Sequence, residues 1–197
     1  MGASPILRFT EEQYLAMDQE IAGRSEFHGG VVLPVEAATV SHEAIVANLL
    51  GEVRTAARGT PGRVFGPQLR TRIPRARYCY PDATLICGSP ELYEDRRDTI
   101  VNPVAVFEIL SPSTESFDRG LKFAAYRDLP SLRQYVLIAQ TEPRIEWFVK
   151  SPEGFWVLHD ASGPGARLEI PSIAAAIPLA SIYEGVEFEP APFPGGV

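Results

Sequence analysis

Glu108 is a carboxylate in apolar surroundings, because it lies inside the run Val104–Leu110, whose other members are all hydrophobic. Such a run is typical of a strand that is buried on both faces of a sheet. Burying an ionised carboxylate costs several kcal/mol, so a fold that keeps one there usually pairs it with a cation or a metal ion. Glu108 is therefore the first candidate for a functional site.

A second carboxylate, Asp82, follows Pro81 at the start of another expected strand, over residues 80–87. If this strand pairs antiparallel with the run that holds Glu108, the start of one lies beside the end of the other, and Asp82 comes close to Glu108. Two neighbouring carboxylates repel each other unless a cation lies between them, and their oxygen atoms suit Mg²⁺. The sequence equally allows a plainer alternative, in which Asp82 is a turn residue and Glu108 pairs with an arginine.

Asp118 and Lys122 lie four residues apart on a helix that is expected over residues 117–128. Because a helix that follows a buried strand packs back on the sheet, Lys122 can approach the two carboxylates. The alternative is a solvent-exposed ion pair, which is worth only a few tenths of a kcal/mol. Asp118 fits a plain acid at the start of the helix slightly better than a residue that positions Lys122.

The remaining pattern predicts the elements that would hold these residues, in a mixed α/β arrangement. A capping box of Thr10 with Gln13 opens a first helix, Gly29-Gly30 suits the turn of a hairpin, and Ser41 is expected to cap a longer helix that ends near residue 58. Helices and strands do not alternate strictly, so the sheet should contain both parallel and antiparallel neighbours. Strands are expected at residues 26–28, 31–33, 63–65, 69–73, 80–87, 104–110, 134–139, 145–150 and 155–159.

Length and charge limit the class of protein. The chain has 197 residues, enough for one domain, which we assign to residues 1–188, with a flexible tail over residues 189–197. A net charge of −7 argues against a broad surface for nucleic acid, because phosphate binding needs clustered lysine and arginine. Seven arginines between residues 54 and 77 leave two interpretations open, a local basic groove or a solvated positive face.

The cysteines and histidines predict neither a disulfide nor a zinc site. Cys79 and Cys87 lie at the two ends of one expected strand, too far apart to pair, and none of the three histidines has ligand spacing. The N-terminus has no apolar signal core and no apolar run approaches membrane length, so the cytoplasm is the simplest location.

The chain resembles the Uma-two family of restriction endonucleases, within the PD-(D/E)XK nuclease superfamily, over about residues 8–185. The resemblance implies a restriction-endonuclease-like core, with helices on both faces of a mixed β-sheet and an additional late β-meander. It also implies metal-dependent cleavage of phosphodiester bonds. The residues that carry it are Pro81-Asp82, the segment Val106–Thr114, Asp118, Lys122, Tyr126 and the strand Gln134–Ile138, with the hairpin Ser25–Gly30 and His42 as weaker features.

This resemblance assigns roles to several of the same residues. Asp82 matches the aspartate of the superfamily motif and Glu108 matches its second acid. Position 110, where the simplest motif has lysine, is Leu110 here. In the resembled family the lysine is thought to have moved to the following helix, which makes Lys122 the candidate.

The implied cofactor is Mg²⁺, with Mn²⁺ as a substitute, held by Asp82, Glu108 and the backbone carbonyl of Ile109. Glu43 is a further candidate ligand, although an acid that complements the dipole at a helix start explains it more simply. The implied activity is an endonuclease acting on DNA as a homodimer. The rival interpretations are an idle nuclease fold that serves as an interaction or regulatory module, and a phosphoesterase for a smaller substrate.

Overall fold

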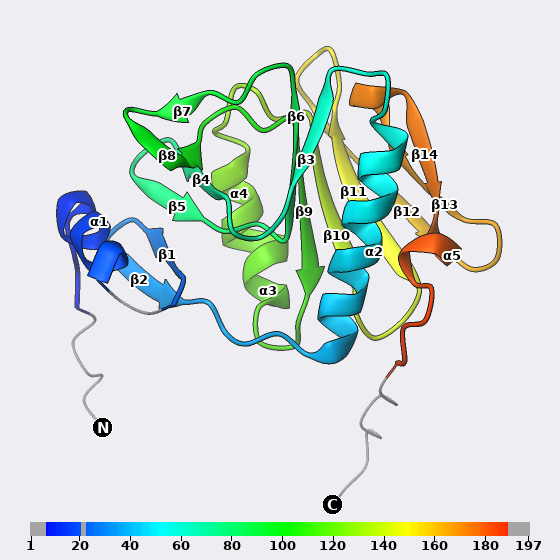
Figure 1. Cartoon of the computed structure of the whole chain (residues 1–197), viewed down its shortest axis with the longest axis horizontal. Helices are drawn as coiled ribbons and strands as arrows, with labels where there is room; N and C mark the ends of the chain where they lie inside the picture. Colours follow the sequence, from blue (N-terminus) through cyan, green and yellow to red (C-terminus); the bar gives the residue numbers. More distant parts are fainter. Residues whose placement is uncertain (1–6, 21–22, 189–197) are drawn as a thin grey trace, which may run out of the picture.

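A six-stranded mixed sheet forms the centre of the structure (Figure 1), a computed structural model that describes residues 7–20 and 23–188. The tail predicted over residues 189–197 lies outside the described residues. β9 and β10 pair parallel, and the other neighbours in this sheet pair antiparallel. The three late strands predicted as a meander are present and extend this sheet. Its order is β12 (Trp156–Ser162), β11 (Arg144–Lys150), β10 (Gln134–Ala139), β9 (Ala105–Leu110), β6 (Ala83–Cys87) and β3 (Gly62–Phe65).

Helices cover both faces of this sheet, as predicted. The long helix α2 (Val40–Ala56) runs along one face (Figure 1), where its buried Ile45 and Leu49 share a core cluster with Leu85 and Phe107. These apolar residues recur every three or four positions, which places them on one stripe of the helix. All six residues of β9 are buried, so the prediction of a strand covered on both faces is confirmed.

The opposite face is covered by a helical segment that changes its winding. Val106 and Leu110 of β9 pack there against Phe123 and Tyr126. A helix was predicted over residues 117–128. The segment is helical, but the prediction of one regular helix is wrong, because a wider turn interrupts it. Its parts are α3 (Glu115–Phe117), a π-helical turn (Asp118–Lys122) and α4 (Phe123–Tyr126).

A second six-stranded sheet lies beside the first, and α1 (Glu11–Glu20) packs on it through Tyr14, which shares a cluster with Phe27 and Tyr78. The predicted hairpin forms its outer two strands, with positive φ angles at both turn glycines. The strands β7 and β8 were missed because β7 has only two residues and β8 is largely polar. The order is β2 (Val31–Pro34), β1 (Ser25–His28), β5 (Arg77–Cys79), β4 (Arg70–Ile73), β8 (Arg96–Ile100) and β7 (Leu92–Tyr93).

A small hairpin near the end of the described chain was also missed. β13 (Arg167–Ile170) and β14 (Ala175–Pro178) pair antiparallel and are followed by the short helix α5 (Leu179–Ile182). Their apolar residues, including Leu168 and Ile177, complete the core cluster beneath α2.

The strand predicted over residues 80–87 starts three residues too early, since only β6 (Ala83–Cys87) forms there and the preceding strand β5 (Arg77–Cys79) belongs to the other sheet. β5 ends at Cys79 and β6 begins at Ala83, because Pro81 cannot donate to a ladder and interrupts the pairing. The prediction that Cys79 and Cys87 lie at the two ends of one strand is therefore wrong, since they belong to different strands in different sheets, and both thiols are free. Asp82 lies in the connection, immediately before β6.

The hydrogen bonds at the starts of α1 and α2 test the two helix caps that were predicted from the sequence. The capping box is confirmed, since the Thr10 N–H donates to Gln13 Oε1 at 2.8 Å and the Gln13 N–H donates to Thr10 Oγ1 at 3.2 Å. The cap predicted for α2 is wrong by two residues. Thr39 accepts the N–H of His42 at 3.2 Å, whereas the Ser41 hydroxyl donates to the carbonyl of Glu187.

Several arginines of the 54–77 segment are used in ion pairs within the fold rather than in a basic groove. Arg70 is 1% exposed and pairs with Asp18 and Asp98, Arg72 pairs with Glu11 at 3.2 Å, and Arg75 and Arg77 pair with Asp128. The pairs of Arg70 and Arg72 attach α1 to the second sheet. Among the described residues, we find no helix with both the length and the apolar character that a bilayer crossing requires.

Candidate active site

Asp82 and Glu108 come together where β6 and β9 meet. The two strands pair antiparallel with Ala83 opposite Phe107, so the residue before Ala83 stands beside the residue after Phe107. The N–H of Ile109 donates to Asp82 Oδ2 at 2.7 Å, which fixes the carboxylate at this end of the sheet. The antiparallel pairing predicted from the sequence is confirmed, and so is the proximity of the two acids.

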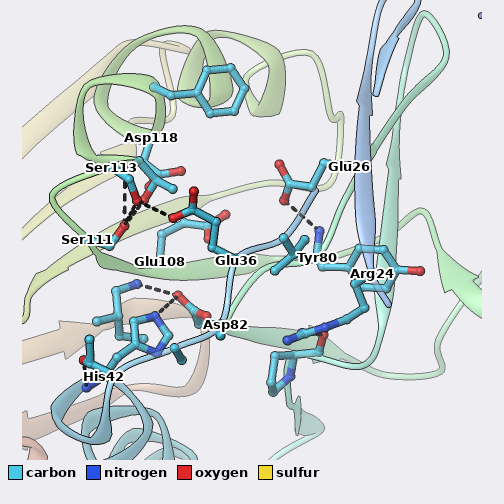
Figure 2. Close-up of a pocket in the computed structure, with 18 of the residues that line it drawn as sticks. Arg24, Glu26, Glu36, His42, Tyr80, Asp82, Glu108, Ser111, Ser113 and Asp118 are labelled. Carbon is cyan, nitrogen blue, oxygen red and sulfur yellow. Dashed lines mark hydrogen bonds and ion pairs between the residues drawn. The ribbon is translucent and has the colours of Figure 1, made fainter. Parts of the chain in front are cut away.

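The two acids open onto a cavity of about 530 Å³ between the start of α2, the hairpin and the loop after β9 (Figure 2). Figure 2 shows Asp82, Glu108 and Asp118 around one space, with His42 beside Asp82. Glu26 and Lys122 also line the cavity. A volume of this size is in the range of small-ligand sites and can admit part of a larger substrate.

Lys122 reaches the same point from the π-helical turn. Its Nζ lies 3.0 Å from Glu108 Oε1, 3.1 Å from Glu26 Oε1 and 3.4 Å from Asp118 Oδ1, and the residue is only 6% exposed. The alternative of an exposed Asp118–Lys122 pair is therefore wrong, and the alternative in which an arginine neutralises Glu108 is wrong as well. The partner of Glu108 is a lysine.

Asp118 is not a plain acid at a helix start. It is 3% exposed, contacts Lys122, and its backbone carbonyl accepts the hydroxyl of Tyr135 at 3.0 Å. A π-helical turn is wider than an α-helical one and is common at functional sites. Here the turn begins with Asp118 and ends with Lys122, and both side chains are buried beside Glu108.

Leu110 shows why the lysine comes from the helix. Residues 108 and 110 share one face of β9, since side chains alternate along a strand. Leu110 packs there with Phe123 and Tyr126 of α4. The helix that supplies Lys122 therefore covers the same face on which a lysine at position 110 would lie.

Glu26 is the site residue that sequence reasoning missed. It lies on β1 in the second sheet, is 7% exposed, and accepts the N–H of Tyr80 at 3.0 Å in addition to its contact with Lys122. The sequence shows Glu26 and His28 two positions apart on one strand, a pattern typical of a solvated strand face. The one signal for Glu26 in the sequence was that the hairpin containing it belongs to the family resemblance. That resemblance assigned no role to the glutamate.

Carboxyl groups outnumber cations in the cluster, and their pKa values shift in different directions. Burial raises the pKa of Glu108 well above its usual value, against the lowering effect of Lys122, and Asp118 and Asp82 raise it further. Burial also raises the pKa of Asp118. For Glu26 burial acts in the same direction, but Lys122, His28 and the Tyr80 N–H outweigh it and lower the pKa to about 2.

Lys122 stays charged in spite of its burial. Desolvation alone would lower the pKa of its ammonium group, but Glu108, Glu26 and Asp118 together raise it well above its usual value. One ammonium group faces three carboxylates, so the cluster retains excess negative charge whenever all three are ionised.

His42 and Glu43 lie at the start of α2. His42 Nε2 is 3.4 Å from Asp82 Oδ2, and although burial lowers the pKa of His42, Asp82 and Glu43 raise it above its usual value. Glu43 is exposed and lines the cavity, and among the residues described it forms no ion pair. Ile109 also lines the cavity. The metal-binding roles of Glu43 and of the Ile109 carbonyl remain predictions.

The fold is of the restriction-endonuclease-like class. It matches the crystal structure of "a putative nuclease belonging to DUF820" from Anabaena variabilis ATCC 29413, with a TM-score of 0.70 over 89% of this chain and 97% of that chain, at 18% identity. The model of the Uma2 family, described as "Putative restriction endonuclease", matches residues 11–180, and the chain belongs to this family.

Two curated relatives from Synechocystis sp. extend over most of the chain. The protein sll1609 is 29% identical over 161 residues, which is 81% of this chain and 91% of that protein. The protein slr1290 is 28% identical over 189 residues, 94% of this chain and 97% of that protein. Both are described as uncharacterized. They show that the sequence similarity extends over most of the chain, and they give no information about its activity.

Proposed function

We propose that the protein is a Mg²⁺-dependent endonuclease that hydrolyses phosphodiester bonds of DNA, with Asp82, Glu108 and Lys122 as its catalytic residues. The observation that carries the proposal is the meeting of two carboxylates from adjacent strands with a buried lysine at one cavity. Membership of a family described as restriction endonucleases supports the choice of reaction.

The residues fit a divalent cation. Glu108 Oε1 and Asp118 Oδ1 are buried beside the cavity, and the Nζ atom of Lys122 lies 3.0 Å and 3.4 Å from them. Oxygen ligands with excess negative charge suit Mg²⁺. Asp82, Glu108 and the Ile109 carbonyl would hold it, with Glu43 as a further ligand and Mn²⁺ as a substitute ion.

Each residue then has a definite task. Bound at these carboxylates, Mg²⁺ supplies Lewis-acid chemistry, polarising a phosphate and lowering the pKa of a water. Lys122 orients the attacking water or stabilises the charge that develops on the phosphate oxygens. Glu26 and Asp118 hold the ammonium group of Lys122, and His42 holds one oxygen of Asp82 so that the other can serve as a ligand.

We further propose a cytoplasmic homodimer, because cutting both strands of a duplex requires two sites. The outer strand β12 supports this assembly. Its residues Val157 and Leu158 are 47% and 54% exposed, and Phe155 beside it is 70% exposed. An unpaired edge strand with apolar side chains is suited to pairing with a second copy.

The test is cleavage of supercoiled plasmid with Mg²⁺ or Mn²⁺ by the native protein and by Glu108→Gln. Glu169→Gln is the matched control, since Glu169 is an exposed strand residue remote from the cavity. We expect cleavage by the native protein and the control, and none by Glu108→Gln. Equal activity in the native protein and Glu108→Gln would refute the assignment.

Two further arms separate the rival functions. A divalent ion that binds the native protein and not Asp82→Ala excludes the idle fold. Hydrolysis of a small aryl phosphodiester without cleavage of plasmid would instead indicate a phosphoesterase for smaller substrates. The net charge of −7 and the arginines engaged in ion pairs favour testing this alternative directly.

A further inference from the structure

Glu26, His28 and Cys79 form a second cluster of potential metal ligands, which shares Glu26 with the cluster around Lys122. Glu26 and His28 share one face of β1, and the register that sets Phe27 opposite Tyr78 brings Cys79 of β5 opposite Glu26. Their ligand atoms all lie within 4.8 Å of one another. Residues that are 51 positions apart in the sequence thus meet through strand pairing.

The distances between these atoms suit a tetrahedral ion. His28 Nε2 lies 3.0 Å from Glu26 Oε2 and 3.8 Å from Cys79 Sγ. Tetrahedral bonds of ~2.0–2.1 Å to nitrogen or oxygen and ~2.3 Å to sulfur place neighbouring ligand atoms roughly 3.3–3.6 Å apart. Small side-chain adjustments are enough to reach that spacing without moving the strands.

The donor set selects the kind of ion. One thiolate, one imidazole and one carboxylate suit zinc and similar transition-metal ions, whereas Mg²⁺ prefers oxygen ligands alone. Zn²⁺ with a thiolate, a carboxylate and a neutral imidazole is electrically neutral, which is a favourable state for a buried site. Cys79 is fully buried, and its thiol would lose its proton to the solvent when the ion binds.

Glu26 can serve both clusters because its two oxygen atoms have different partners. Oε1 contacts Lys122 and accepts the N–H of Tyr80, whereas Oε2 contacts only His28 among the residues described. An ion at Oε2 would therefore leave the contact with Lys122 intact. It would also restrain the carboxylate that holds Lys122 in place.

We propose that Glu26, His28 and Cys79 bind a zinc-type ion, separate from the site of Asp82 and Glu108, and that this ion fastens β1 to β5 behind the cavity. The absence of ligand spacing in the sequence argued against a zinc site, but that argument considers residues close in the chain, and this cluster depends on strand pairing. The proposal does not require the protein to cleave DNA.

Cobalt titration tests the proposal through a signal that only sulfur ligation gives. Metal-free protein, prepared with a chelator, is titrated with Co²⁺ while the near-ultraviolet thiolate-to-cobalt charge-transfer band is recorded. We expect the band to saturate at one equivalent and to be absent in Cys79→Ser. Cys87→Ser is the control, because Cys87 is the other thiol and lies in the other sheet, and it should keep the band.

Further variants make every outcome decisive. His28→Gln should weaken Co²⁺ binding by at least the ~10–100-fold that loss of an outer-shell partner costs, and it replaces Cys79→Ser if that variant does not fold. Asp82→Ala should keep the band although it loses Mg²⁺ binding. No band in the native protein, an unchanged band in Cys79→Ser or in His28→Gln, or loss of the band in Cys87→Ser would overturn the proposal.

Discussion

Replacing Lys122 by methionine should destabilise the metal-free protein by about 3–5 kcal/mol near neutral pH, because removing one partner of a buried ion pair leaves uncompensated charge. The pKa of Glu26 supports the direction of this effect. Glu26 has a pKa lowered from 4.5 to about 2 against the effect of its burial, and Lys122 makes the largest favourable contribution.

The loss should depend on pH in a stated direction. In the native protein the lowered pKa of Glu26 contributes stability that is complete above pH 4.5 and is lost as the pH falls toward 2. Without Lys122, burial raises the pKa of the same carboxyl group. The group therefore takes up a proton as the pH falls from neutral, which removes the cost of its buried, unpaired charge in the variant. The difference in unfolding free energy between native and Lys122→Met protein should therefore shrink on acidification.

The assay is urea unfolding in the presence of a chelator, at about pH 7.5 and about pH 5, followed by tryptophan fluorescence. Lys150→Met is the matched control, since Lys150 is half-buried on β11 and approaches only the ring of Trp156, at 5.9 Å. We expect the control to change stability by less than about 1 kcal/mol. A loss in Lys122→Met no larger than in the control, or a loss that does not shrink at the lower pH, would refute the reasoning.

Three further outcomes are expected. Glu108→Gln should abolish metal-dependent cleavage while changing the unfolding free energy by less than about 1 kcal/mol, because burial already disfavours the charged form of Glu108; a large loss in urea unfolding would contradict this. Since a proton competes with Mg²⁺ for Glu108, calorimetric Mg²⁺ affinity should fall as the pH falls, and Asp82→Asn should bind weakly at every pH. Leu49→Ala, in the fully buried face of α2, should cost about 2–5 kcal/mol in the same unfolding assay without altering the metal affinity of surviving folded protein.

The parts of the fold that were predictable are those with a strong local signal. The uniformly apolar run of β9 and the stripe of Ile45 and Leu49 on α2 each identify an element without reference to the rest of the chain. The short strands β7, β8, β13 and β14 have no such signal, since their pairing comes from tertiary contacts. The break between β5, which ends at Cys79, and β6, which begins at Ala83, was signalled by Pro81, whose effect was underestimated.

For the candidate site, the two acids and the approach of Lys122 were predictable, whereas the burial of Asp118 and the contribution of Glu26 were not. Asp82 and Glu108 follow from antiparallel pairing of neighbouring strands, which needs only sequence order. Asp118 is buried at the start of the π-helical turn. The i, i+4 spacing of Asp118 and Lys122 in the sequence fits an ordinary α-helix equally well, so it does not reveal this turn. Glu26 comes from a different sheet, so its contact with Lys122 depends on how the two sheets pack.

Under the proposed mechanism, this packing gives the second sheet a role in the chemistry of the first. The acids of the central sheet, Asp82 and Glu108, have Lys122 from the helix that follows β9, but that lysine needs Glu26 to balance and orient it. A change that loosens the hairpin would therefore displace Lys122 without touching either acid. The hairpin is thus expected to act on the reaction through the position of one ammonium group, which also explains why a zinc-type ion on the far oxygen of Glu26 would rigidify the site.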